Sequence, residues 1–247
     1  MAFRKIQKVV LLFIFFTVSR SFSLPAWVTS EADAYSKLKS ELSHKSGDFL
    51  KRTVRRLGNN TIELEGFASI SGSLPVFSRV AGDLPGYRNW ALEGINQKPT
   101  GGNYHLKILD LRTVSNPPNR LLAKFGLTFP GIHHTFERAF TINNFSNPQS
   151  STVTCESVPT SHSLLSSLVG FITAFPDPKH QERLWVYFKG KAQLTSWILY
   201  QALPEKLLST ESSQRIQTVL DNYGNEEVRK LTAESNRIKA PKKKWKN

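Results

Sequence analysis

Alternating apolar and polar residues over the middle of the chain predict a series of β-strands. The clearest case is residues 121–129, where every second residue from Leu121 to Phe129 is apolar and would lie on one face of a strand. Similar patterns predict strands at 61–70, 104–114, 135–142, 152–158, 168–175, 183–188 and 193–202. A hairpin turn is expected at 189–191, and residues 168–175 also fit a helix.

Helical spacing of apolar residues predicts helices on both sides of these strands. Residues 25–57 read as helical after a weak capping box at Ser30, and Gly58-Asn59-Asn60 would end that helix. A short helix is predicted at 75–80, and residues 207–223 carry one apolar face of a long helix. This order predicts an α+β fold in which a curved antiparallel sheet wraps around a long C-terminal helix (a helix-grip), with an extra N-terminal helix.

The first 23 residues have the pattern of a secretory signal peptide. Arg4, Lys5 and Lys8 precede the apolar run Val9–Phe16, and Ser21-Phe22-Ser23 puts small residues at positions −3 and −1 of a cleavage site. The apolar run is too short to span a bilayer, although an uncleaved anchor is the alternative. We therefore expect an exported protein, periplasmic or secreted after cleavage near Ser23.

The chain accordingly divides into a signal peptide (1–23), an N-terminal helical extension (24–58), a main domain (59–236) and a basic tail (237–247). The formal charge is +14, and the leader holds four cations and no acid, which leaves +10 for the rest. Outside the cytoplasm the available polyanions include lipid head groups, and we expect no nucleic-acid partner. An anionic membrane surface would attract the tail, and a solvated tail is the alternative. The tail residues concerned are Lys242, Lys243, Lys244, Trp245 and Lys246.

Few residues suggest catalysis. Cys155 is the single cysteine, so no disulfide forms within the chain, and a structural thiol is favoured over a nucleophile. On a strand, His133 and Glu137 would share a face and could form a proton-transfer pair or two metal ligands, whereas the alternative is an exposed edge. No zinc spacing, hydrolase elbow or phosphate loop is present. The sequence therefore assigns no catalytic residue, metal or cofactor.

Three segments, in this order, resemble the START-like (helix-grip) superfamily of polyketide cyclase and lipid-transfer domains. They are Glu63–Ile70 leading into Leu74–Val80, the loop from Gly82 to Trp90, and Leu203-Pro204-Glu205-Lys206-Leu207. The loop is similar to the family's Asp-x-Tyr-x-x-Trp turn, although its Asp83-to-Tyr87 spacing is longer by one or two residues. The resemblance covers roughly residues 62–231.

This resemblance implies a deep apolar pocket between the sheet and the C-terminal helix, which would hold a lipid or other hydrophobic small molecule. The residues expected to line it are Trp90, Phe125, Leu127, Phe129, Phe136, Arg138, Phe140, Tyr187, Trp197, Leu199, Val219 and Tyr223. Arg138 falls on the Phe136/Phe140 face by alternation and would hold a ligand's head group, unless it forms a surface salt bridge. A one-residue slip would reverse each face. The alternative is that these side chains fill a solid core.

Three functions remain open at this stage. The first is an exported protein that binds a hydrophobic ligand for transfer or sensing. The second is an enzyme on the same fold, a cyclase or hydrolase that uses His133, Glu137 or Asp110. The third is a cationic module that binds envelope polyanions through its surface.

Overall fold

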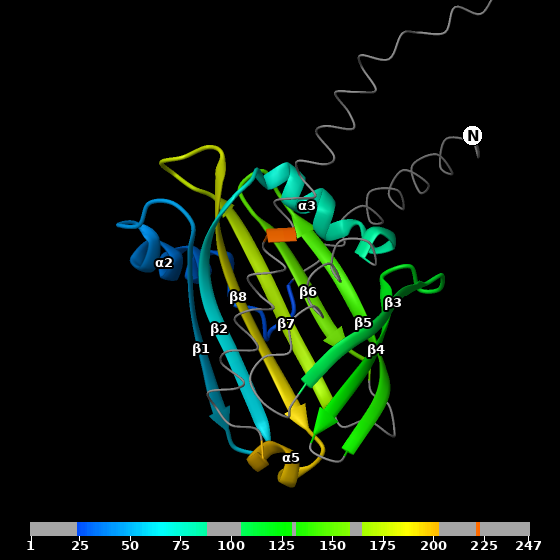
Figure 1. Ribbon diagram of the computed structural model, residues 1–247. Helices are drawn as coiled ribbons and strands as arrows, with labels where there is room; N and C mark the ends of the chain where they lie inside the picture. Colours follow the sequence, from blue (N-terminus) through cyan, green and yellow to red (C-terminus); the bar gives the residue numbers. More distant parts are fainter. Residues whose placement is uncertain (1–23, 88–104, 130–131, 159–164, 203–220, 223–247) are drawn as a thin grey trace, which may run out of the picture.

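A computed structural model describes residues 24–87, 105–129, 132–158, 165–202 and 221–222 of the chain (Figure 1). The predicted signal peptide and the basic tail lie outside these residues. So does nearly all of the predicted C-terminal helix, of which only Asp221 and Asn222 are described, both as helical. The long helix that the sheet is expected to wrap therefore stays a prediction.

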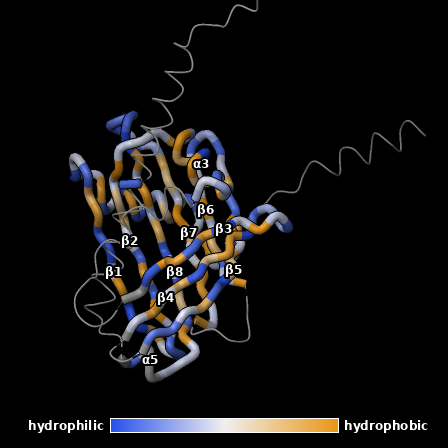
Figure 2. The backbone as a smooth tube through the Cα atoms, turned by 45° about the vertical axis from the view of Figure 1, so that its right-hand side comes forward, coloured by the Kyte–Doolittle hydropathy of each residue, from blue (hydrophilic) through white to orange (hydrophobic). Residues whose placement is uncertain are grey.

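The described residues form an antiparallel sheet of eight strands. Its strands are β1 (Phe49–Leu57), β2 (Thr61–Ser71), β3 (His105–Val114), β4 (Arg120–Phe129), β5 (Ile132–Ser146), β6 (Ser151–Ser157), β7 (Leu165–Pro176) and β8 (Arg183–Leu194). Their order across the sheet is β1-β2-β8-β7-β6-β5-β4-β3. Figures 1 and 2 show the sheet curving so that its β3–β4 end turns toward the viewer. The predicted curved antiparallel sheet is confirmed.

Besides Asp221 and Asn222, the described residues form four short helical elements: α2 (Glu31–Leu42), α3 (Leu74–Gly82), the 3-10 helix η1 (Leu84–Gly86) and α5 (Trp197–Ala202). The predicted cap of α2 is confirmed, because the Ser30 hydroxyl accepts a hydrogen bond from the Asp33 backbone N–H at 3.1 Å. The short helix predicted at 75–80 is confirmed as α3. In Figure 1, α3 crosses the upper end of the sheet and α5 lies at its lower end. None of the described helices is long and apolar enough to cross a membrane.

The two faces of the sheet bury different sets of side chains. On β8, Leu184, Val186 and Phe188 belong to an apolar core shared with α3, and we call this side the inner face. Trp185 and Tyr187 point to the other side, the outer face, where they pack against α2 and residues 24–28. The alternation of hydropathy along the strands is visible in Figure 2. Both faces of β8 are therefore covered, which explains why this strand is apolar on both sides.

The prediction of one helix over residues 25–57 is wrong in its second half. The helix α2 ends at Leu42, and residues 49–57 form the edge strand β1, which pairs with β2 over its whole length. Gly47 adopts a positive φ of 78° between the two elements. Asn59 and Asn60, with φ of 57° and 55°, form the tight turn from β1 to β2. Pairing with β2 overrides the helical spacing of the few apolar residues in this segment.

The predicted hairpin at 189–191 is also wrong. β8 continues through this segment to Leu194, and residues 197–202 form the helix α5 in place of a strand. Gly190 pairs with Leu64 of β2 on one side and with Gly170 of β7 on the other. Because both neighbouring strands hold this stretch in register, it stays extended despite its turn-like composition. The strand prediction for 168–175 is confirmed as β7, and its helical alternative is wrong.

Candidate functional site

Side chains on the inner face are fully buried near α3 and more exposed toward α5. Near α3, Ala68, Val186 and Ala174 are fully buried and belong to the core. Farther toward α5, the inner-face apolar side chains are only partly buried. These are Leu64, Phe125, Phe136, Cys155, Leu168 and Ile172. The lower part of the inner face is thus an apolar surface that the protein leaves partly accessible.

Three phenylalanines of β4 and β5 form a cluster on this surface. Phe125 and Phe136 lie opposite each other in the strand pairing and stack with ring centroids 5.1 Å apart. Phe140 meets Phe125 edge to face at 6.2 Å and is buried. Such ring pairs add about 0.5–1.5 kcal/mol beyond their buried area. The face predicted for these residues is the one observed, and their contact with a ligand stays a prediction.

Arg138 is a buried cation on the same face. Its side chain is 1% exposed and lies between Phe136 and Phe140 along β5. One guanidinium nitrogen, Nη2, donates to the Ser166 backbone carbonyl at 2.6 Å and to the Ser157 hydroxyl at 3.4 Å. Burial lowers the pKa of Arg138. These hydrogen bonds offset part of the cost of burying the charge and fix the position of the guanidinium.

A pair of glycines leaves the floor of the inner face bare. Gly170 and Gly190 pair across β7 and β8, next to Cys155 on β6. A Cβ at Gly170 would meet only backbone, namely the Lys189 carbonyl oxygen at 3.4 Å and the Gly190 Cα at 3.6 Å. Among the described residues, no side chain lies within 4 Å of either position. The pair therefore leaves this part of the face without side chains.

Cys155 lies beside this glycine pair. Burial, with a smaller contribution from the charge of Glu156, raises the pKa of the Cys155 thiol to about 12. A thiol with such a pKa is almost entirely protonated at neutral pH and is a poor nucleophile. Its environment therefore agrees with a structural thiol.

Tyr187 does not lie with the other predicted pocket residues. It is fully buried on the outer face, where its ring packs against Phe67 at 5.4 Å and Phe171 at 5.6 Å. Its hydroxyl donates to the Glu65 carboxylate at 2.6 Å, and Lys37 of α2 donates to both groups. The prediction that Tyr187 lies on the pocket-lining face of β8 is therefore wrong. Because β8 is apolar on both faces, the order of its residues does not indicate which face is the inner one.

Six other predicted residues cannot be assigned to the inner face. Trp197 begins α5 and is 64% exposed. The side chains of Phe129 and Leu199 lie outside the described residues, as do Trp90 and the two helix positions Val219 and Tyr223. The helix α5 itself is fixed to the sheet, because the Tyr200 hydroxyl donates to the Leu57 carbonyl oxygen at 2.7 Å.

The residues considered for catalysis lie on the outer face of β3 and β5. His133 and Glu137 are exposed, and they alternate with the inner residues Phe136 and Arg138. The His133 ring contacts the Thr128 hydroxyl at 3.2 Å, and Glu137 pairs with Arg112 at 3.4 Å. Asp110 pairs in register with Lys124, which also lies on the outer face. In the part of the chain that the structure describes, no group of three or more His, Cys, Asp or Glu side chains could hold a metal ion.

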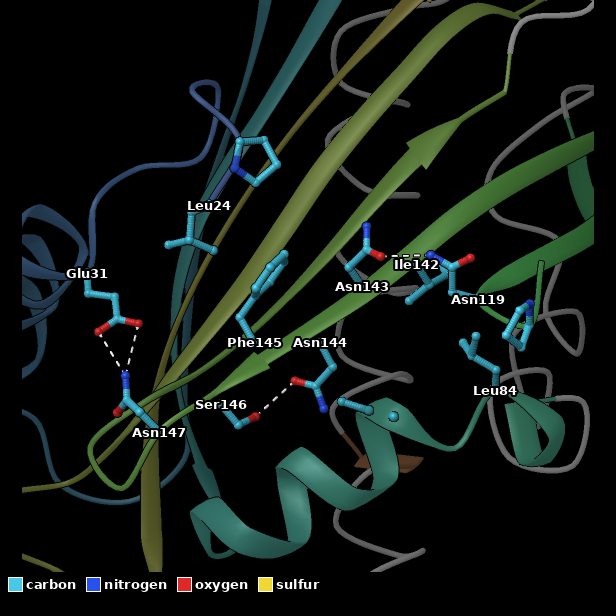
Figure 3. Close-up of a pocket in the computed structure, with 14 residues that line it drawn as sticks. Leu24, Glu31, Leu84, Asn119, Ile142, Asn143, Asn144, Phe145, Ser146 and Asn147 are labelled. Atoms are coloured by element: carbon cyan, nitrogen blue, oxygen red, sulfur yellow. Dashed lines mark hydrogen bonds between the residues drawn. The ribbon is translucent and has the colours of Figure 1, made fainter. Parts of the chain in front are cut away.

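Sequence patterns gave no indication of the concavity that lies beside the end of β5. It has a volume of about 860 Å³. The lining residues are Leu24, Pro25, Glu31, Ala81, Gly82, Leu84, Pro118, Asn119, Ile142, Asn143, Asn144, Phe145, Ser146 and Asn147. Figure 3 shows residues 142–147 between Leu24 and Glu31 on one side and Leu84 on the other. These residues come from four separate parts of the sequence, so only folding brings them together. We call this concavity the β5-edge slot.

The sequence matches no protein-family model and no curated protein. Solved structures similar to this chain include a STAR-related lipid transfer protein from Xanthomonas axonopodis, at 17% identity and a TM-score of 0.40, covering 70% of this chain and 96% of that one. A Streptomyces aromatase/cyclase is similar at 11% identity and a TM-score of 0.41, covering 69% and 96% of the two chains. A START superfamily protein from Mycobacterium smegmatis is similar at 9% identity and a TM-score of 0.40, covering 68% and 95%.

These similarities are to the group of proteins that the sequence resembles. The TM-scores are below 0.5, so the similarities carry no ligand, activity or residue role to this chain. The function therefore has to be inferred from the protein's own residues.

Proposed function

We propose that the protein binds a lipid or another hydrophobic small molecule against the inner face of its sheet. The observation that carries this proposal is the partly accessible apolar surface around Phe125 and Phe136, with the buried cation Arg138 beside it. Apolar concavities with a few fixed polar groups are the usual form of small-molecule sites. The bare floor at Gly170 and Gly190 gives the ligand room next to the strands.

Affinity would come mainly from burying the ligand's apolar area, at about 25 cal/mol per Å². Arg138 would orient the ligand by attracting an anionic or strongly polar head group, since its guanidinium is already held in place by Ser157 and Ser166. A ligand with an apolar body and one acidic group, such as a fatty acid or an anionic lipid, matches both features.

Export is part of the proposal, and it rests on the leader pattern of residues 1–23. Outside the cytoplasm the protein would transfer or sense its ligand. The basic tail, with Trp245 among its lysines, would bring the protein to anionic membrane surfaces.

A hydrolase or cyclase on this fold is the second candidate, and the described residues favour it less. A catalytic acid or base has to reach the bound substrate. His133, Glu137 and Asp110 are on the outer face, on the opposite side of the sheet from the apolar surface.

The direct test is native mass spectrometry of the chain Leu24–Asn247, produced by export from cells, with organic extraction of whatever co-purifies. A discrete lipid-sized adduct is expected, and it would identify the ligand class. The matched variant Gly190→Leu places a side chain on the bare floor and should lower the fraction of protein that carries the adduct. A clean mass for the parent chain, in every lipid background tried, would contradict the proposal and leave surface binding of polyanions as the alternative.

A further inference from the structure

Among the described residues, no strand pairs with one end of β5 on its β4 side. The pairing of β4 with β5 stops at Arg120 and Thr141, and one more bond links the Ile142 N–H to the Asn119 carbonyl oxygen at 2.8 Å. Beyond this point β5 continues to Ser146 and pairs with β6 alone among the described strands. Pro117 and Pro118 stand just before β4, and because proline has no N–H, this segment cannot extend β4 along β5.

The backbone of this edge offers regularly spaced hydrogen-bonding groups. In an antiparallel sheet, the N–H and C=O groups of successive residues point alternately to the two neighbouring strands. The Ile142 N–H points to the β4 side, so those of Asn144 and Ser146 point there as well. No described strand pairs with them on that side. This pattern of donors and acceptors is complementary to one further strand.

The β5-edge slot lies along this edge. One wall comes from the end of α3 and from η1, at Ala81 and Leu84, and the other from Leu24 and Glu31 (Figure 3). Its volume of about 860 Å³ lies in the range of small-molecule and peptide sites. A single extended segment fits between two such walls with its backbone against β5.

The side chains in the slot are largely engaged with one another. The Asn144 amide donates to the Ser78 carbonyl oxygen at 2.8 Å. The Asn147 side chain accepts from the Ser150 N–H at 2.8 Å and donates to Glu31 at 3.3 Å. A polyhydroxyl ligand such as a sugar would need these groups for recognition. In this protein these side chains hold the end of β5 in place. The backbone groups along the edge of β5 are therefore the main groups left to recognise a ligand.

The charge of the lining residues indicates which side chains the β5-edge slot could accept. Among the described residues that line the slot, Glu31 is the one charged side chain, although the chain as a whole carries a formal charge of +14. The other lining side chains are apolar or neutral and include Leu24, Leu84 and Phe145. The slot therefore suits apolar side chains and one basic side chain, and it disfavours acidic ones.

We propose that the β5-edge slot binds an extended peptide of apolar and basic composition, which adds to β5 as a further strand. Peptide recognition at a sheet edge takes its affinity from main-chain hydrogen bonds and its selectivity from pockets for alternate side chains. The slot does not include the accessible apolar surface around Phe125 and Phe136, so a peptide and a hydrophobic ligand could bind at the same time.

The test uses the chain Leu24–Asn247 labelled with ¹⁵N and the peptide acetyl-Thr-Val-Lys-Val-Thr-amide at millimolar concentration. Without peptide, the backbone amides of Asn144 and Ser146 should exchange rapidly with solvent. With the peptide, their exchange should slow and their resonances should shift. The same peptide with alternate amides N-methylated cannot pair with a strand and should have no effect.

Two variants test the role of Glu31. A peptide with Glu in place of Lys should bind about fivefold more weakly than the Lys peptide, since ion pairs at partly exposed sites are modest. Glu31→Gln should remove this difference, whereas Glu41→Gln, on the same helix but outside the slot, should preserve it.

Three results would overturn the proposal. The first is slow exchange of the Asn144 and Ser146 amides without peptide, which would mean that the chain itself fills the slot. The second is equal binding of the N-methylated peptide. The third is a set of identical resonance shifts with maltose, which would make the slot a sugar site.

Discussion

The Tyr187 hydroxyl donates a hydrogen bond of 2.6 Å to the Glu65 carboxylate, beneath the helix α2. Lys37 of α2 reaches the same carboxylate at 2.9 Å and the same hydroxyl at 3.2 Å. This three-residue network joins the N-terminal helix to strands β2 and β8 in a partly buried setting. It therefore ties the first described segment of the chain to the centre of the sheet.

The network predicts a specific pH dependence of stability. Burial alone would raise the pKa of Glu65, but hydrogen bonds from Tyr187 and Lys37 outweigh it and the pKa is lowered. A carboxyl group whose pKa is lower in the folded state stabilises the fold above its unfolded pKa, and this stabilisation is lost as the pH falls through the folded value. The parent protein should therefore lose stability on acidification more steeply than Glu65→Gln.

The measurement is the urea midpoint at a series of pH values from neutral to acidic. Glu41→Gln is the matched control, because Glu41 pairs with Lys51 on the surface and should leave the slope almost unchanged. Parallel curves for the parent and Glu65→Gln would contradict the prediction.

On the alkaline side the same network should lose stability again. The hydrogen bond to Glu65 raises the pKa of Lys37 despite the opposing effect of burial. The pKa of Tyr187 is also raised, mainly by burial and to a smaller extent by its hydrogen bond to Glu65. Groups with raised pKa values stabilise the fold below their unfolded pKa and cease to do so as the pH rises through the folded value. Tyr187→Phe should reduce the loss of stability between about pH 10 and higher values, measured by the same urea midpoints.

Gly66 and Gly190 should respond differently to the same substitution. A Cβ at Gly66 would clash with the Phe188 ring and would lie 2.7 Å from the Lys51 carbonyl oxygen. Gly66→Ala should therefore cost about 1–3 kcal/mol of unfolding free energy. Gly190→Ala meets only backbone at ordinary contact distance, so its cost should be smaller. Denaturant unfolding measures both costs. A Gly190 variant less stable than the Gly66 variant would contradict the close packing at Gly66 and the looser packing at Gly190.

Arg138 should affect ligand occupancy more than any surface arginine. Arg138→Ala removes the buried cation of the inner face, and occupancy by an anionic lipid should fall about tenfold, as expected for the loss of a hydrogen bond to a charged group. Arg112→Ala, in a surface ion pair on the neighbouring part of the sheet, should leave occupancy unchanged. Native mass spectrometry measures both.

A fold control accompanies the arginine variants. Arg138→Met keeps most of the side-chain volume, so it separates loss of charge from loss of packing. Unchanged occupancy in a folded Arg138→Met protein would show that the charge of Arg138 does not contribute to ligand binding.

The docking of α2 can be tested by truncating one core side chain. Leu38 is fully buried in the outer-face cluster with Phe171 and Tyr187. Leu38→Ala should destabilise the whole protein by about 2–5 kcal/mol, because the cavity opens under the helix. The neighbouring exposed Lys39→Ala should have little effect. A normal thermal midpoint for Leu38→Ala would mean that α2 contributes little to the folded domain.

Much of this fold could be predicted from local patterns. The strand at 120–129 was predictable because one of its faces is apolar and the other polar, and alternation is informative whenever a single face is buried. The cap at Ser30 follows from the chemistry of that residue alone. A turn was also expected at Asn59-Asn60, although as the end of a helix and not between two strands. Arg138 and the Phe136/Phe140 face were found in the same way.

Tertiary pairing decided the remaining features. Residues 49–57 and 189–191 became strand because neighbouring strands satisfy their backbone groups, which no local pattern records. The face that Tyr187 takes could not be predicted, because β8 is covered on both sides and its apolar residues do not indicate which face each one takes.

By itself, the sequence determined the class of fold, most of the strand positions and the presence of a cation on an apolar face, since these depend on side chains close together along the chain. Only the tertiary structure decided which face each β8 residue takes and where the β5-edge slot lies. The slot joins Leu24, Leu84, Asn119 and Asn144, and residues so far apart in sequence come together only after the sheet has formed.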